Sequence, residues 1–141
     1  ALLRRIDGVV LNDAEAKLLT GNENLVQAGR AVLELGPKFA VIKKGEHGAM
    51  FFGPDEVFVM PAYPTPDVVD PTGAGDSLAG GMMGYLAAQG RFDPPTLKQA
   101  LAYGTIVASF NFEDFSLERM KRIDRGDIDV RLGRYKQMLS F

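Results

Sequence analysis

The sequence contains no cysteine and only one histidine among its 141 residues. Without cysteine, neither disulfide bonds nor thiolate metal sites can hold the fold together, and we expect a cytoplasmic protein. A single histidine excludes the H-E-x-x-H zinc motif. The chain also lacks a Gly-Lys-Ser/Thr phosphate loop and a G-x-G-x-x-G turn after a strand, so two common nucleotide-binding schemes are excluded as well.

Charge and hydropathy exclude two classes of partner. The net charge is −2, so there is no basic excess to attract a nucleic acid backbone. No apolar run approaches the roughly 20 residues that a membrane-spanning helix needs, and no basic-then-apolar signal segment opens the chain. A hydrophobic share of 46% with 24% charged residues is typical of a globular protein. We therefore expect a globular domain with neither a nucleic acid nor a membrane partner.

Alternating strand and helix patterns predict an α/β domain whose largely parallel sheet is flanked by helices. Short apolar runs predict strands at residues 6–11, 39–44, 49–52 and 56–60, the third returning from the second as a hairpin. Helical spacing predicts helices at residues 12–19, 25–35, 75–89 and 94–110, with a mostly helical tail over 116–141. Asn12 or Asp13 is placed to cap the first helix. The second and fourth helices have apolar faces, formed by Leu25, Ala28, Val32 and Leu35 and by Leu97, Ala100, Leu101, Gly104 and Ala108. Ligands of such sheets bind where the carboxyl end of a strand gives way to a helix.

The stretch VVDPTGAGDSLAGG, residues 68–81, places glycines and carboxylates at one strand-to-helix turn. Gly73 and Gly75 have no side chains, so another group can approach the backbone closely. The following helix begins with N–H groups that lack helical partners, and this end of its dipole is positive. Together these features predict an anion site, most naturally for phosphate.

Asp76 is an unfavourable neighbour for a bound anion because like charges repel. The carboxylate is useful there if it accepts the proton of a hydroxyl that attacks the phosphate. The structural alternative is that Asp76 caps the helix and the glycines form a tight turn. The small residues that follow, Ala79, Gly80, Gly81 and Gly84, favour close helix-to-sheet packing.

Residues 70–76, DPTGAGD, resemble the D-T-x-G-A-G-D signature of the ribokinase-like (PfkB) family of sugar and nucleoside kinases, with proline in place of the first threonine. Two further segments stand in family order. LNDAE resembles the N-x-x-E motif through Asn12 and Glu15, and KKGEHG resembles the T-L-G-x-x-G segment through Gly45 and Gly48. The resemblance implies that residues 1–141 are the C-terminal nucleotide-binding and catalytic portion of a three-layer kinase fold, without its N-terminal sugar-binding half and lid.

The resemblance also implies roles for single residues. Asp76 would be the base that activates the acceptor hydroxyl, within an anion hole formed by the backbone of Gly73, Ala74, Gly75 and Asp76. The residues implied to bind the nucleotide are Asn12, Lys43, Gly45, Gly48, Gly75 and Gly104. Those implied to bind metal are Glu15 for Mg²⁺, largely through water, and Asp70 and Thr72 for a monovalent cation such as K⁺.

Several positions depart from the family pattern or have a simpler explanation. SFNFEDFS, residues 109–116, does not match the family's usual cation-binding segment, which would lie around residues 110–114. Gly104 stands where a polar residue is common near the base. Glu15 could be a solvated carboxylate on a helix face, and Gly45 and Gly48 could form an ordinary hairpin turn. His47 is interpreted as a turn residue near the nucleotide rather than a catalyst.

The implied activity is the transfer of the ATP γ-phosphate to a hydroxyl of a small sugar or nucleoside, with Mg²⁺ required.

Three alternatives stay open: a non-catalytic nucleotide-binding half-kinase or assembly module, a hydroxymethylpyrimidine-type kinase, and a serine hydrolase. The last rests on GDSL, residues 75–78, but Ser77 would need an Asp-x-x-His segment that the chain lacks. The chain begins without Met and enters a strand almost at once, so we expect that it has lost its natural beginning or is part of a longer protein. A sheet divided in this way exposes an apolar edge, which favours self-association or pairing with the missing half.

Overall fold

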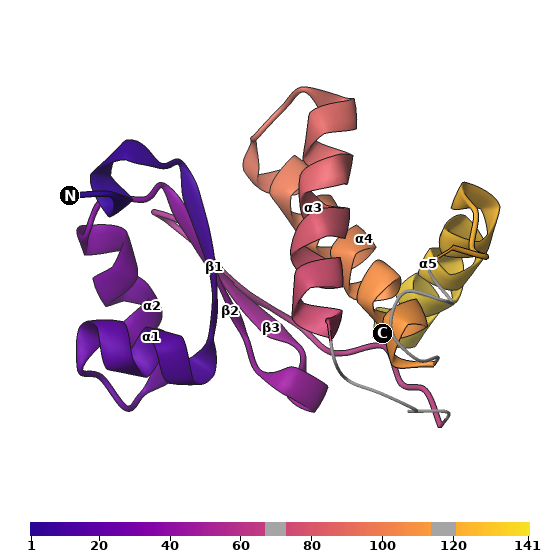
Figure 1. Ribbon diagram of the computed structural model, residues 1–141, viewed down its shortest axis with the longest axis horizontal. Coiled ribbons are helices and arrows are strands. Elements are labelled where there is room, and N and C mark those ends of the chain that lie inside the picture. The colour runs from indigo at the N-terminus through magenta and orange to yellow at the C-terminus, as the bar shows by residue number, and fades with distance from the viewer. Residues whose placement is uncertain (67–72, 114–120) are drawn as a thin grey trace. The chain divides into compact units, whose positions relative to one another are not determined.

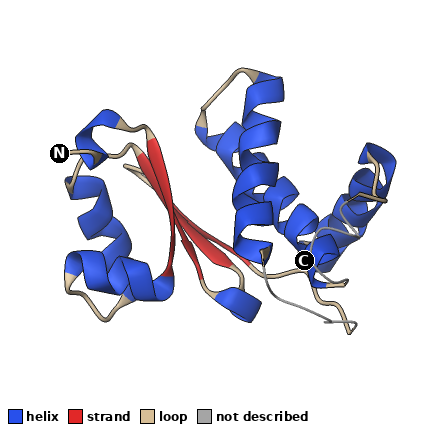
Figure 2. Cartoon of the chain, in the orientation of Figure 1, coloured by secondary structure: helices blue, strands red, loops and turns tan. Residues whose placement is uncertain are grey.

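The computed structural model describes residues 1–66, 73–113 and 121–141, which belong to two units. The sheet unit spans Ala1–Ala62, and the helical unit spans Tyr63–Phe141. Within the described residues, all strands belong to the first unit, and the second is built from helices α3, α4 and α5 (Figures 1 and 2).

The sheet unit places two helices between its first two strands. Its elements are β1 (Gly8–Asn12), α1 (Asp13–Thr20), α2 (Leu25–Glu34), β2 (Phe39–Lys43), the short 3-10 helix η2 (Gly45–His47), β3 (Ala49–Phe52) and β4 (Val57–Met60), after the 3-10 turn η1 (Leu3–Arg5). The sheet order is β1-β2-β3-β4, and β1 pairs with β2 in parallel. A parallel pair needs a long crossover connection, which α1 and α2 supply.

The predicted α/β class is confirmed, but the described sheet is mixed rather than largely parallel. β3 pairs antiparallel with both of its neighbours. Its Phe52 lies opposite Ala40 of β2, and its Ala49 lies opposite Met60 of β4. The connections give the reason: η2 and the turn at 53–56 are far shorter than the dozen or more residues that a parallel return needs. The predicted hairpin over 39–52 accounts for the first of these pairings.

The core of the sheet unit lies between the sheet and the helices α1 and α2. Its buried members are small or branched side chains and one aromatic ring: Ala16, Ala28, Val32, Ala40, Ile42 and Phe52. A β-carbon on Gly29 would collide with the ring of Phe52, so this glycine lets α2 approach β3. Leu35, predicted to continue the buried face of α2, is 40% exposed because the helix ends at Glu34.

The helical unit consists of α3 (Ala74–Gln89), α4 (Pro94–Phe112) and α5 (Arg125–Leu139). Asp93 caps α4, and the hydrogen bonds from the Thr96 hydroxyl and backbone N–H lower the pKa of its carboxyl. The predicted apolar stripe of α4 is buried, and burial extends to every residue over 104–111. Among the described helices, none is both long and apolar enough to cross a membrane.

Two glycines bring α3 and α4 into close contact. A β-carbon on Gly81 would lie 3.0 Å from the Cα of Gly104, and one on Gly104 would collide with the carbonyl oxygen of Leu78. The contact at Gly81 is therefore between helices, where the sequence analysis predicted helix-to-sheet packing. Beyond its chain neighbours and the nearby backbone of α3, an added β-carbon on Gly80 or Gly84 would have no described atom within 4 Å.

We expect Gly104→Ala to destabilise the protein by about 1–3 kcal/mol, because the new methyl group overpacks the α3–α4 contact. Gly84→Ala is the matched control, since it adds the same methyl group to a helix in open space. It should stabilise the protein by up to about 1 kcal/mol, because alanine favours the helical backbone. Urea unfolding of both variants measures the difference. Equal effects in the two variants would contradict the assigned packing.

Candidate functional site

The predicted anion turn forms the start of α3. Gly73 precedes the helix with φ 81°, a left-handed conformation that glycine adopts without strain. The first helical hydrogen bond runs from the N–H of Ser77 to the carbonyl of Gly73 at 2.9 Å. The N–H groups of Ala74, Gly75 and Asp76 precede that bond, so they have no partner within the helix. The turn thus presents the backbone donors that an anion needs.

Asp76 lies exposed in the first turn of α3. The residue that caps this helix is Gly73, which has no side chain, and Asp76 sits three positions further on. The alternative in which Asp76 caps the helix is therefore wrong. Its carboxylate belongs to the same first turn as these N–H donors, where it could meet both a bound phosphate and an approaching hydroxyl.

Asn12 and Glu15 form a reciprocal capping box at the start of α1. The Asn12 side-chain oxygen accepts the Glu15 backbone N–H at 2.7 Å, and the Glu15 Oε2 accepts the Asn12 backbone N–H at 2.8 Å. The N-x-x-E spacing is thus sufficient to begin a helix. The sequence alone also allowed Glu15 to be a solvated carboxylate with no structural role. The structure gives it one, because the carboxylate accepts a backbone hydrogen bond where β1 ends.

Lys43 lies beside this box, because it pairs with Asn12 at the carboxyl ends of the parallel strands β1 and β2. The loop that follows turns on two glycines of positive φ, Gly45 at 57° and Gly48 at 86°. Gly45 has open space around it, whereas a β-carbon on Gly48 would collide with the carbonyl oxygen of Met60. The sheet unit therefore gathers Asn12, Glu15, Lys43 and the two glycines at one edge, and their role in binding a nucleotide stays a prediction.

The other predicted residues are not gathered in the same way. Gly104 lies at the contact with α3, so the helix packing already explains its lack of a side chain, and its place near a nucleotide base stays a prediction. Asp70 and Thr72 lie outside the described residues. Within the described ranges, no group of three or more His, Cys, Asp or Glu side chains could hold a metal ion.

Asn111 is a site neighbour that the sequence analysis missed. This residue of α4 is 1% exposed, and its Nδ2 would lie 3.8 Å from a β-carbon on Gly73. The end of α4 thus lies beside the first residue of the anion turn. SFNFEDFS contains this asparagine, but the sequence analysis noted that segment only for its departure from the family.

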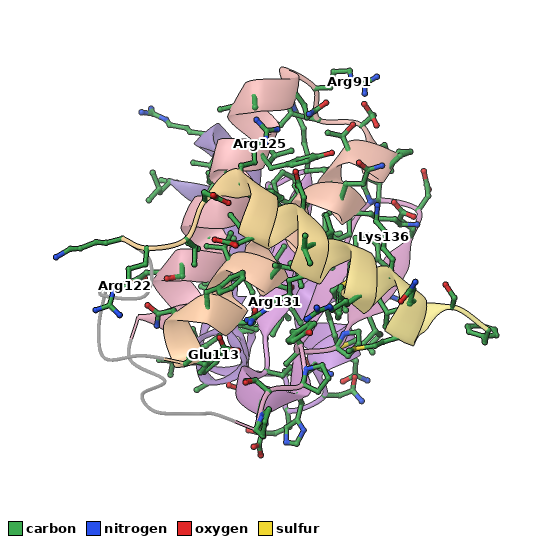
Figure 3. All side chains as sticks on the ribbon, turned by 90° about the vertical axis from the view of Figure 1, so that its right-hand side faces the viewer. Arg91, Glu113, Arg122, Arg125, Arg131 and Lys136 are labelled. Atoms are coloured by element: carbon green, nitrogen blue, oxygen red, sulfur yellow. The ribbon has the colours of Figure 1, made fainter. Side chains whose placement is uncertain are left out.

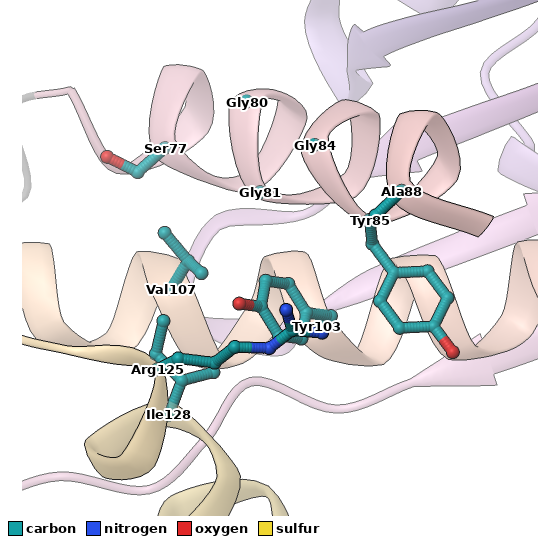
Figure 4. Close-up of a pocket in the computed structure, with 10 residues that line it drawn as sticks. All are labelled: Ser77, Gly80, Gly81, Gly84, Tyr85, Ala88, Tyr103, Val107, Arg125 and Ile128. Atoms are coloured by element: carbon teal, nitrogen blue, oxygen red, sulfur yellow. The ribbon is translucent and has the colours of Figure 1, made fainter. Parts of the chain in front are cut away.

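A cavity of about 460 Å³ lies between the three helices of the helical unit (Figure 4). Its lining residues are mostly small or apolar: Ser77, Gly80, Gly81, Gly84, Tyr85, Ala88, Tyr103, Val107, Arg125 and Ile128. The absence of side chains at Gly80 and Gly84 leaves it open along α3. Arg125 is the one lining residue with an ionisable group other than a tyrosine hydroxyl, so the cavity offers packing surface rather than reactive groups.

Comparison with known proteins matches most of the chain to one family. The family described as pfkB family carbohydrate kinase matches residues 1–120. A cytidine kinase of Thermococcus kodakarensis is 37% identical over 87 residues, which cover 60% of this chain and 31% of that protein. A bifunctional ribokinase/ribose-5-phosphate isomerase A of Fructilactobacillus sanfranciscensis is 31% identical over 117 residues, covering 79% of this chain and 21% of that protein.

Solved structures show the same fold. A ribokinase of Arabidopsis thaliana, complexed with ribose and ATP, superposes with a TM-score of 0.78 at 26% identity over 93% of this chain and 42% of that one. This likeness confirms the ribokinase-like fold class. The chain spans less than half the length of each of these relatives.

Two variants of Glu15 separate the capping role from a role in metal binding. Glu15→Gln keeps the capping box, because glutamine also serves at this position, whereas Glu15→Ala removes it and should cost about 0.3–1.5 kcal/mol of stability. If the carboxylate also serves Mg²⁺, Glu15→Gln weakens Mg²⁺-dependent nucleotide binding while the melting temperature stays at the wild-type value. Nucleotide titrations with and without Mg²⁺ test this, and unchanged binding would leave Glu15 with the capping role alone.

Proposed function

The chain belongs to the pfkB family of carbohydrate kinases, and from this we propose that its protein transfers the γ-phosphate of ATP to a hydroxyl of a sugar or nucleoside. One observation carries the proposal: the start of α3 combines backbone N–H groups that have no helical partner, a glycine of positive φ and an exposed carboxylate. Relatives named as a cytidine kinase and a ribokinase support this substrate class.

In the proposed reaction, the anion turn stabilises the phosphoryl group during transfer. The acceptor oxygen forms the new bond to the γ-phosphorus while the bond to the β,γ-bridging oxygen breaks, and Asp76 accepts the hydroxyl proton. The N–H groups at the start of α3, with Gly73, Ala74 and Gly75 leaving the backbone open, meet the charge of the transferring group. ADP and the phosphorylated acceptor are the products.

We propose that the nucleotide lies at the edge formed by Asn12, Lys43, Gly45 and Gly48. Glu15 suits Mg²⁺, which usually keeps several waters and binds through one or two carboxylates and the substrate phosphates. Such a site needs no cluster of acidic side chains. Mg²⁺ would neutralise charge on the phosphates. A monovalent cation at Asp70 and Thr72 stays a prediction.

The acceptor pocket is proposed to lie in the part of the protein that the relatives have and this chain does not span. Residues 1–141 then form the C-terminal nucleotide-binding and catalytic portion, and an N-terminal half supplies the sugar site and lid. A non-catalytic nucleotide-binding module is the second candidate, because the chain covers only 31% and 21% of the two curated relatives. Phosphoryl transfer by the full-length protein separates the two.

Asp76→Asn in the full-length protein should lower kcat by about 10²–10⁴-fold, because the proton acceptor is lost. The Kd for ATP should stay within about twofold, since the backbone donors remain. Asp127→Asn is a matched control, because Asp127 occupies the same position in the first turn of α5, and it should leave kcat unchanged. Steady-state phosphorylation across a panel of sugars and nucleosides measures both. A fully active Asp76→Asn variant would contradict the assigned base.

We expect the 141-residue chain by itself to self-associate. Within the described sheet, β1 pairs with β2 alone, and its residues Val9, Val10 and Leu11 are only half-buried. An apolar edge strand of this kind pairs with other chains. Sedimentation velocity at two concentrations would detect the assembly, and Val10→Lys should reduce it because a charged edge resists pairing. A wild-type chain that stays monomeric and unfolds cooperatively would contradict this expectation.

A further inference from the structure

Arg131 of α5 is held on several sides at the end of α4. Its Nη1 donates to the Ser109 hydroxyl at 3.0 Å, and its Nη2 donates to Oε2 of Glu113 at 3.0 Å, with Oε1 at 2.9 Å. The guanidinium carbon also lies 3.7 Å from the centre of the Phe110 ring. Figure 3 labels Arg131 on α5 and Glu113 at the end of α4.

The ion pair is largely removed from water, because both side chains are only 16% exposed. Burying two charges costs desolvation energy, so such a pair contributes little net stability unless its hydrogen bonds are well made. What it provides is fixed geometry, since the planar guanidinium reaches the Ser109 hydroxyl and the Glu113 carboxylate through different nitrogens and stacks on the Phe110 ring. The pair therefore helps to fix the last turn of α4.

The end of α4 has two further neighbours in the helical unit. Glu113 accepts a hydrogen bond from the Thr65 hydroxyl at 3.1 Å. Asn111, two residues before Glu113, has its amide nitrogen 3.8 Å from the place that a β-carbon on Gly73 would occupy. The helix that ends at Glu113 thus lies beside the first residue of the anion turn.

We propose that Arg131 is a positioning residue for phosphoryl transfer, acting through Glu113 and Asn111 on the backbone of the anion turn. The inference rests on the proposed kinase function. Arg131 holds the end of α4, and the end of α4 holds Gly73 where its neighbouring N–H groups meet the transferring phosphoryl group. The contribution is made in the transition state, so losing it lowers kcat more than it raises the KM for ATP.

The test compares Arg131→Lys and Arg131→Met in the full-length protein, at a temperature well below their melting transitions. Lysine keeps the charge but lacks the planar fork. We expect kcat to fall by about 10- to 100-fold in both variants, because small displacements of reacting groups cost this much, while the KM for ATP stays within about twofold. Thr65→Val removes a single hydrogen bond of the network and should lower kcat in the same direction, which keeps the test open if an arginine variant fails to fold.

Tyr85→Phe is the matched control. It removes a 2.6 Å hydrogen bond between the hydroxyl of Tyr85 and Gln99, which also joins α3 to α4 but involves neither Asn111 nor the anion turn. It should lower the melting temperature without changing kcat. The proposal is overturned if Arg131→Lys and Thr65→Val keep wild-type kcat. It is also overturned if Tyr85→Phe lowers kcat as much as the Arg131 variants do for the same loss of melting temperature.

A double-mutant cycle tests the route through α4. Asn111→Ala and Arg131→Met should give less than multiplicative losses of kcat when combined, because they act on the same turn. Fully multiplicative losses would overturn the route through Asn111. Failure of the kinase function itself has a different signature: a wild-type protein that phosphorylates no acceptor, or an Asp76→Asn variant that is as active as wild type.

Discussion

The close approach of α3 and α4 at Gly81 and Gly104 determines the geometry of the helical unit. Because neither residue has a side chain, the two backbones touch, with the Leu78 carbonyl against Gly104. Two rigid helices in such contact have few alternative placements. The start of α3 is consequently set beside the end of α4, where Asn111 meets Gly73. The position of the anion turn follows from helix packing several turns away as much as from the glycines of the turn itself.

The sheet unit orders its edge by a different means, through backbone hydrogen bonds. Asn12 and Glu15 exchange two bonds exactly where β1 passes into α1, and the parallel register places Lys43 next to Asn12. A motif that the family resemblance associates with phosphate and metal is therefore also the beginning of a helix. The two uses are compatible, because a carboxylate has two oxygens and one bond to the backbone orients the other.

Features encoded by local spacing could be predicted from the sequence. The apolar stripe of α4, the capping at Asn12 and the glycine turn before α3 each depend on residues close together in the chain. Contacts between elements could not be predicted in the same way. Periodicity shows that a helix face is small or apolar, but it does not show which element covers that face. Gly81 is therefore predicted to pack against a sheet, whereas in the structure it packs against α4. The pair of Glu113 and Arg131 joins two helices and leaves no local pattern.

That pair also has a consequence for biosynthesis. Ribosomes make a chain from its N-terminus, so Glu113 leaves the ribosome before Arg131 does. Until α5 follows, the carboxylate of Glu113 faces water, and the last turn of α4 lacks the cation that holds it. The end of α4 therefore acquires its full set of contacts only after the later helix has been made.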